Sequence, residues 1–109
     1  MCSLPCKDKL HAFWDGVLGH DERPAKAIAA AALLPIAPSE GAGIIDVDAW
    51  VAESVEAAKT HVYMEPVGPD GHGPVTLDDT YRANAKAVAQ KRIALAGARL
   101  AHLIRAALK

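Results

Sequence analysis

A histidine and an aspartate four residues apart, His11 and Asp15, are the pair of side chains in this sequence best suited to site chemistry. On a helix, residues i and i+4 lie one above the other on the same face. An imidazole nitrogen and a carboxylate oxygen placed in this way can bind one metal ion, and zinc accepts both ligand types. The same spacing is also typical of a solvated, hydrogen-bonded pair. Because zinc binds three protein ligands and water, or four protein ligands, the pair alone is an incomplete metal site.

Two cysteines precede this pair, and together they give the pattern Cys2-x3-Cys6-x4-His11-x3-Asp15. The four side chains could form a compact zinc site. However, the spacing matches no common zinc motif, and aspartate is an unusual fourth ligand in a structural site. Two incidental thiols on a frayed N-terminus account for the pattern as well, so both interpretations stay open.

The composition favours helices as the elements that position these side chains. Hydrophobic residues make up 51% of the 109 residues, many of them alanine, and only 5% are aromatic. A chain of this length forms at most one domain. We therefore expect an all-α fold of about four helices with a long C-terminal helix.

Helical periodicity, capping residues and Pro/Gly-rich stretches predict where these helices begin and end. Asp46 and Asp48 are the expected N-cap and first-turn acid of the third helix. Thr76 is the expected N-cap of the last helix, with Asp78 and Asp79 in its first turn. The predicted helices span residues 10–18, 25–34, 46–63 and 76–109, with loops at 35–43 and 64–75.

The spacing of residues on the last two helices predicts which faces are buried. A 3-4 stripe from Tyr81 to Ala107 is expected to be buried along its whole length. Gly97, in the middle of the last helix, predicts that another backbone approaches closely there. Glu53 and Glu56, on the third helix, are expected to point mostly outward.

Charge is distributed unevenly along the chain, whose net charge is −1. All 13 acidic residues lie at or before Asp79, whereas 7 of the 12 basic residues lie after it. Such an asymmetry is typical of nucleic-acid or membrane contact, or of a basic end that packs on an acidic remainder. The basic residues are scattered around the last helix, and Arg92 and Arg99 lie on or beside the predicted buried stripe, where a charge needs a partner. This arrangement favours internal pairing.

The sequence carries no signal for a membrane or for export. No stretch reaches the roughly 18 uninterrupted apolar residues of a membrane span. Residues 1–7 lack the apolar core of a signal peptide. As written, the chain is expected in the cytoplasm, with no membrane partner.

Taken together, the landmarks resemble the C-terminal part of the S1/P1 nuclease family. These are zinc-dependent, single-strand-preferring nucleases with an all-helical fold shared with zinc phospholipase C. The resemblance spans residues 10–109 and leaves residues 1–9 as an unmatched N-terminal segment. The matching pieces are Leu10-His11-x-x-Trp14-Asp15, Trp50-x-x-Glu53-Ser54 with Val62-Tyr63, Leu77, Tyr81, and Ala96-Gly97-x-Arg99-Leu100-Ala101.

The resemblance implies that His11 and Asp15 are ligands of one of three clustered zinc ions. It further implies hydrolysis of phosphodiester bonds in single-stranded DNA or RNA, and a secreted or periplasmic setting. The chain departs from the family at Lys9, where asparagine is usual, and lacks the motif His-x-x-x-Asp-x-His-Gln-Pro-x-His and the N-terminal tryptophan ligand. The remaining histidines do not replace these ligands: His20, His61, His72 and His102. We therefore expect a truncated family member that is inactive alone and binds zinc weakly or partially.

The alternative is a non-catalytic helical module that needs self-association or a partner chain. A family member without its upstream helices would expose apolar surface that the full enzyme buries. We expect such a patch around Phe13, Trp14 and the alanine-rich helix at 25–34.

Overall fold

The computed structural model describes residues 7–19, 22–69 and 76–109, and the regular elements within these ranges are helices. The all-α prediction and the long C-terminal helix are therefore confirmed. None of the described helices is both long enough and apolar enough to cross a membrane. The elements in chain order are α1 (Lys7–Asp15), α2 (Pro24–Ala32), α3 (Ser39–Ala42), α4 (Val47–Ala57), the π-helical turn η1 (Ala58–Val62) and α5 (Asp79–Ala107).

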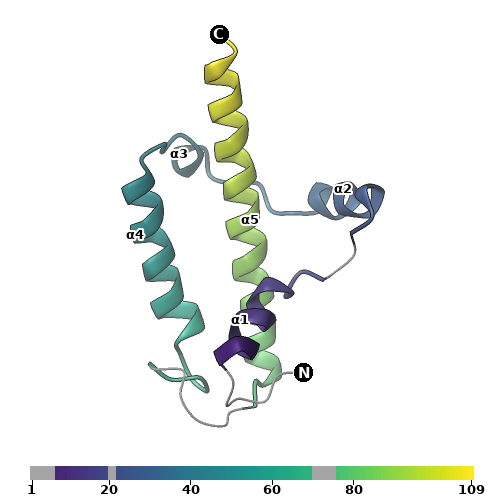
Figure 1. Cartoon of the computed structure of the whole chain (residues 1–109), viewed down its shortest axis with the longest axis vertical. Helices are drawn as coiled ribbons and strands as arrows, with labels where there is room; N and C mark the ends of the chain where they lie inside the picture. The colour runs from purple at the N-terminus through teal and green to yellow at the C-terminus, as the bar shows by residue number, and fades with distance from the viewer. Residues whose placement is uncertain (1–6, 20–21, 70–75) are drawn as a thin grey trace.

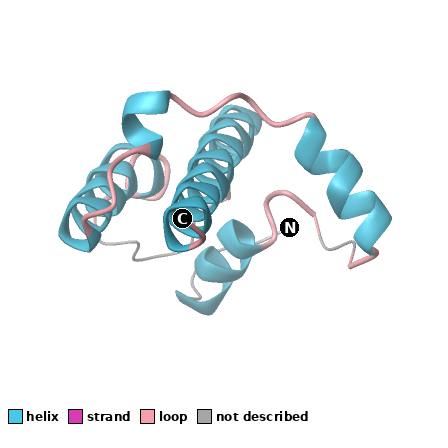
Figure 2. Ribbon diagram, turned by 90° about the horizontal axis from the view of Figure 1, so that it is seen from above, coloured by secondary structure: helices cyan, strands magenta, loops and turns pink. Residues whose placement is uncertain are grey.

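The last helix, α5, is the axis of the molecule (Figure 1). Its 29 residues extend over roughly 43 Å at the usual rise per residue. The whole chain measures 52 × 33 × 21 Å. Helix α4 runs antiparallel beside α5, α1 crosses the N-terminal end of α5, and α2 stands on the other side, as the two ribbon views agree (Figures 1 and 2). Short helix α3 packs on α5.

Local signals account for most helix starts. Asp46 caps α4, because its carboxylate accepts the backbone N–H of Asp48 at 3.0 Å. Pro24 opens α2, where its missing N–H costs nothing. The predicted cap of the last helix at Thr76 is wrong: the cap is Asp78, which accepts the backbone N–H of Tyr81 at 2.8 Å.

Other boundaries also differ from the prediction, among them the end of α2 at Ala32 instead of residue 34. Helix α1 ends at Asp15 instead of Leu18, and the chain then turns to Gly19, whose φ of +103° suits only glycine well. The expected loop at 35–43 contains α3, which α5 holds in place. The third helix does extend to Val62, but as the π-helical turn η1 over its last five residues.

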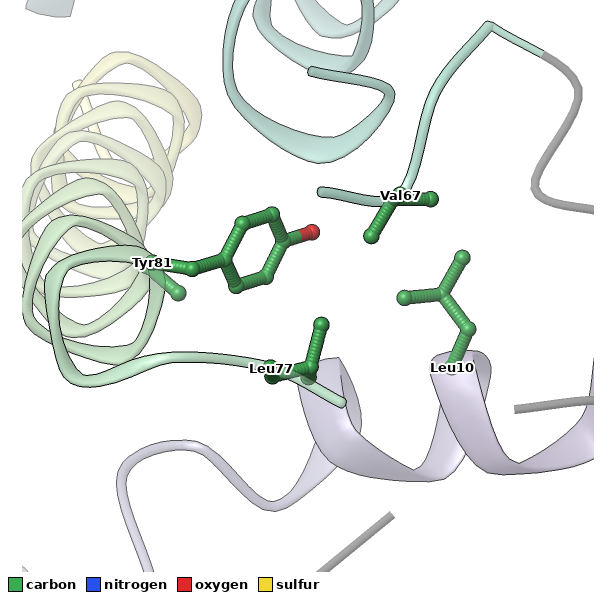
Figure 3. Packing of buried hydrophobic residues seen from close by; sticks show 5 residues of the cluster. Leu10, Val67, Leu77 and Tyr81 are labelled. Carbon is green, nitrogen blue, oxygen red and sulfur yellow. The ribbon is translucent and has the colours of Figure 1, made fainter. Parts of the chain in front are cut away.

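The apolar core is small and lies at the end of the molecule where α1 crosses α5. Leu10, Val67, Leu77 and Tyr81 converge there from three segments: α1, the loop after η1, and the start of α5 with the residue before its cap (Figure 3). Ala85 completes the buried set. The residues that pack partly buried against this cluster are Phe13, Trp14, Val17, Val62 and Met64.

The far half of α5 differs from the prediction of a fully buried stripe. Leu100 is 59% exposed and Leu103 is 39% exposed. The C-terminal turns of α5 extend past α3 and α4, so neither helix covers them (Figure 1). A Cβ added at Gly97 would meet no atom of the described residues within 4 Å, so the predicted close backbone approach is wrong. A close contact does occur at Gly41, but with a side chain: an added Cβ there would lie 3.2 Å from Leu95 Cδ1.

Candidate functional site

Helix α1 presents the His11–Asp15 pair to solvent because its opposite side is anchored in the core. Leu10 and Trp14 are also four residues apart, and both contact the core cluster. One residue further along a helix is a rotation of roughly 100°. Burial of Leu10 and Trp14 therefore turns His11 and Asp15 outward, and their side chains are 79% and 70% exposed.

Tyr81 of α5 fixes α1 through hydrogen bonds and ring contacts. The indole Nε1–H of Trp14 donates to the Tyr81 hydroxyl at 3.1 Å, and that hydroxyl donates to the Val62 carbonyl at 2.8 Å. The rings of Phe13 and Trp14 lie 6.1 and 6.2 Å from the ring of Tyr81. Such edge contacts add to the stabilisation from burial alone. Burial raises the pKa of Tyr81 above its usual value, so the hydroxyl stays protonated.

These contacts correct one expectation about apolar surface. Phe13 and Trp14 do not form an exposed patch, because they pack partly buried on the core cluster. The alanine-rich helix does carry the expected apolar exposure, since Ile28 is 71% exposed and Leu33, which follows α2, is 86% exposed. No residue of α2 is buried.

The two candidate metal ligands lie in direct contact. His11 Nε2 is 3.0 Å from Asp15 Oδ2. Two ligand atoms on adjacent corners of a zinc tetrahedron are about 3.4 Å apart, given zinc–ligand bonds near 2.1 Å. The side chains thus fit one edge of a zinc coordination shell after a small rotation of either group. Both side chains are largely exposed, so this rotation moves them within solvent and not against the core.

The described residues do not complete this shell. Within them, no group of three or more His, Cys, Asp or Glu side chains is placed to hold a metal ion. His61 lies in η1 and His102 lies far along α5. Cys2 and Cys6 lie outside the described residues, as do His20 and His72, so the compact cysteine-containing zinc site stays a prediction. The residues present therefore fit two ligand positions of a zinc ion.

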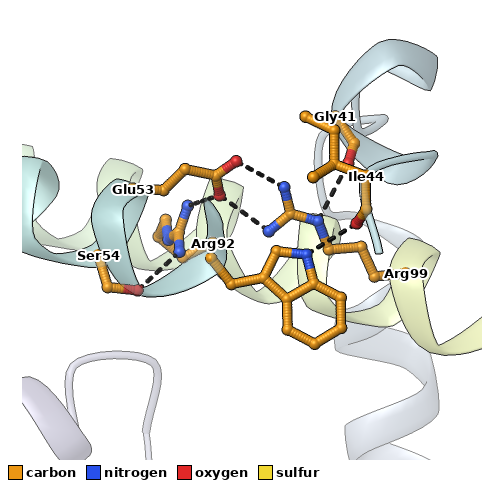
Figure 4. A network of polar contacts seen from close by, with 7 residues as sticks. Gly41, Ile44, Glu53, Ser54, Arg92 and Arg99 are labelled. Atoms are coloured by element: carbon orange, nitrogen blue, oxygen red, sulfur yellow. Dashed lines mark hydrogen bonds and ion pairs between the residues drawn. The ribbon is translucent and has the colours of Figure 1, made fainter. Parts of the chain in front are cut away.

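A second polar cluster joins α3, α4 and α5 around Arg99 (Figure 4). Arg99 is only 6% exposed, and both of its terminal nitrogens donate to the Glu53 carboxylate at 2.8 and 2.7 Å. Its Nε–H donates to the Gly41 carbonyl at 3.0 Å. Arg92 donates to Glu53 at 3.2 Å and to the Ser54 hydroxyl at 3.1 Å. The prediction that Arg92 and Arg99 need internal acidic partners is confirmed.

Trp50 closes this cluster on its apolar side. The Arg99 guanidinium carbon lies 5.5 Å from the centre of the Trp50 ring, within the range of a cation–π contact. The Trp50 Nε1–H donates to the Ile44 carbonyl at 2.7 Å, which ties α4 to the segment that precedes it. The structure thus brings together three of the landmark residues, Trp50, Glu53 and Arg99. We call the contacts of Glu53 with Arg92 and Arg99, and of Trp50 with Arg99, the brace between α4 and α5.

The position of Glu53 differs from the prediction. It was expected to point outward, but its carboxylate lies between the two arginines with 31% of the side chain exposed. The hydrogen bond from Arg99 lowers the pKa of Glu53 to about 2, against the opposing effect of burial, and Arg92 lowers it further. The same bond raises the pKa of Arg99. The signal that pointed to this pairing was two arginines seven residues apart with no acid on their own face of the helix.

The fold and the site define a class of protein: an all-α chain with a solvent-facing His–Asp pair that fits part of a metal centre. A family model described as S1/P1 Nuclease matches residues 5–109. The chain therefore belongs to the S1/P1 nuclease family, as the resemblance predicted. Comparison with curated proteins gave no match, and comparison with solved structures gave none either.

Proposed function

We propose that this chain serves zinc-dependent hydrolysis of phosphodiester bonds in single-stranded nucleic acid. The observation that carries the proposal is the contact between His11 Nε2 and Asp15 Oδ2, 3.0 Å apart on the exposed side of α1. Family membership supports the same reaction class, since the family is a nuclease family.

The role of His11 and Asp15 in this proposal is to hold one metal ion by two donor atoms. Zinc supplies polarisation of a phosphate oxygen and activation of water in sites of this type. The core beneath α1 supplies rigidity, because Trp14, which adjoins Asp15, is hydrogen-bonded to Tyr81. A fixed helix orientation keeps the two donor atoms on one side, as a metal centre requires.

The described residues offer only these two ligands, so we propose that the chain alone holds zinc weakly and hydrolyses nucleic acid poorly. The further ligands would come from residues outside the described ranges or from another chain. The number of metal ions bound per chain tests this directly.

The test is titration of the purified chain with Zn²⁺, and with Co²⁺ as a spectroscopic probe of the coordinating atoms. We expect at most one metal ion per chain, and we expect it to bind weakly. His11→Ala and Asp15→Asn should each weaken the affinity by about tenfold or more. His102→Ala is the matched control, because His102 is also exposed on a helix but has no carboxylate partner among the described residues.

Each outcome has a distinct meaning. Three zinc ions per chain would refute an incomplete ligand set. Unchanged affinity in His11→Ala would remove the pair from the metal site altogether. If replacement of Cys2 and Cys6 by serine abolishes uptake, the compact cysteine-containing site is correct instead.

A second candidate function is a non-catalytic helical module that works by self-association or with a partner chain. The observation that favours it is the exposure of large apolar side chains on and after α2: Ile28 at 71%, Leu33 at 86% and Ile36 at 97%. Exposed apolar surface of this kind is typical of interaction sites. Sedimentation equilibrium tests it, since a monomer at all concentrations would count against self-association, and Ile28→Glu should dissociate any oligomer built on α2.

A further inference from the structure

A cleft of about 520 Å³ lies between η1 and the first half of α5. This volume is within the range of roughly 300–1,000 Å³ that small-molecule sites occupy. The π-helical geometry of η1, in which the Tyr63 N–H bonds to the Ala58 carbonyl at 3.0 Å, is rare and occurs often at functional sites. The polar and larger side chains that line the cleft are Thr60, His61 and Met64 on one wall and Asn84, Lys91 and Arg92 on the other.

The charged groups that line this cleft are basic, and no carboxylate is among the lining residues that the structure describes. Lys91 is exposed and forms no ion pair with any residue that the structure describes. Arg92 is held in place by Glu53 and Ser54. Glu53 is shared between Arg92 and Arg99, so these three side chains together keep one net positive charge. Two positive charges thus border the cleft, which favours an anion.

The rest of the cleft suits a flat, partly apolar group. His61 and Met64 are half-buried on the η1 wall. A nucleobase stacks on flat side chains, and histidine is one of them. Such stacking depends little on which base is bound, because every base has a flat apolar face. Thr60 and Asn84 add hydrogen-bonding groups near the same walls. A basic edge beside a partly apolar wall is the combination that binds single-stranded nucleic acid.

The cleft is also structurally continuous with the helix that carries His11 and Asp15. Tyr81 donates to the Val62 carbonyl of η1 and accepts from Trp14 of α1. Helix α1 and the end of α4 lie at the same end of α5 (Figure 1). One tyrosine therefore sets the positions of both the metal-ligand helix and the η1 wall.

We propose that this cleft is a subsite for one nucleotide of a single strand. Its phosphate lies against Lys91 and Arg92, and its base lies against His61 and Met64. The proposal rests on the proposed function, because the strand bound here would be the substrate. It differs from that function in needing no metal, so binding can be tested in the presence of a chelator.

The test is an NMR titration of the chain with dTMP, thymidine and inorganic phosphate, each in EDTA. We expect dTMP to shift the amide signals of residues 57–64 and 84–92 and to bind more tightly than either thymidine or phosphate. Lys91→Gln should weaken dTMP binding about fivefold, as the loss of one charge contact at an exposed site does. Lys86→Gln is the matched control, because Lys86 lies five residues earlier on the same helix, on a different face, and does not line the cleft.

A salt titration with oligothymidylate sharpens the result. Each phosphate contact in a single strand contributes about 0.7 to the slope of log K against log salt. Lys91→Gln should therefore lower that slope by about 0.7, while Lys86→Gln leaves it unchanged.

The proposal fails if Lys91→Gln behaves like Lys86→Gln. It also fails if phosphate binds as tightly as dTMP, which would indicate a simple anion site, or if thymidine does, which would indicate an apolar one. His11→Ala should leave dTMP binding in EDTA unchanged. The subsite and the metal site can therefore fail independently.

Discussion

Replacement of Glu53 by glutamine tests the brace between α4 and α5 most directly. Glutamine keeps the shape of the side chain but removes the charge and replaces one acceptor oxygen by a donor. Arg99, which is 6% exposed, then loses the carboxylate that accepts from both of its terminal nitrogens. An arginine buried without its partner is strongly unfavourable.

The size of the effect follows from burial on each side of the pair. Removal of one partner from a buried ion pair costs about 3–5 kcal/mol. The Glu53 side chain is 31% exposed, so solvent screens part of the interaction, and we expect a loss of about 2–3 kcal/mol in the free energy of unfolding. For a chain of this size that corresponds to a fall of roughly 10 °C in Tm.

The dependence on pH provides an independent check. The folded-state pKa of Glu53 is about 2, against an ordinary value of 4.5. The carboxylate therefore stabilises the fold fully above about pH 5, and this contribution is lost as the pH falls from 4.5 towards 2. The Glu53→Gln variant has no carboxylate to protonate at this position, so its free energy of unfolding should fall less than that of the parent chain between pH 4.5 and pH 2.

The assay is urea denaturation followed by far-UV circular dichroism, at pH 7 and at several values down to pH 2.5. Glu56→Gln is the control, because Glu56 is exposed on the same helix and has no ion pair among the described residues. If Glu53→Gln unfolds within about 0.5 kcal/mol of the parent chain at pH 7, or keeps its full acid dependence, the reasoning is refuted.

Three further predictions use the same denaturation assay, and a fourth uses hydrogen exchange. Gly97→Ala should raise the free energy of unfolding by about 0.5–1 kcal/mol, since the added Cβ meets nothing within 4 Å; a loss would reveal a contact there. Tyr81→Phe should lower it by about 1–2 kcal/mol, because two hydrogen-bond partners lose the hydroxyl; an unchanged value would contradict the anchoring of α1. Asp78→Ala should lower it by about 1 kcal/mol through loss of the N-cap, unless Thr76 takes over the cap as the sequence suggested. Arg99→Lys should lose the paired contact to Glu53 and the bond to the Gly41 carbonyl, so hydrogen exchange at residues 39–44 should speed up; unchanged protection would show that α3 is held by other contacts.

Helix positions were largely predictable because their signals are local. The cap at Asp46 acts within one turn, and it lies where the sequence predicted it. The error at Thr76 has a tertiary cause. Leu77, only 2% exposed, inserts into the core before the helix can begin.

The spacing of His11 and Asp15 by itself determined that the two side chains share a face, because residues i and i+4 of a helix lie one above the other on the same side. It did not determine which way that face points. That depends on Trp14 and Tyr81, which are 67 residues apart in the chain and meet only after α1 crosses α5.

For the charged residues too, the sequence determined one property and the tertiary structure another. Two arginines on a buried stripe required acidic partners, a conclusion available from the sequence through the cost of burying a charge. Only the packing of α4 against α5 decided that the partner is Glu53, which is 46 residues from Arg99 in the chain. The same packing places the Glu53 carboxylate between the helices, where the sequence had predicted an outward orientation. Capping and periodicity operate within about four residues, and the sequence reports them directly. Contacts between helices depend on how each helix is rotated about its axis, and the tertiary structure alone decides that.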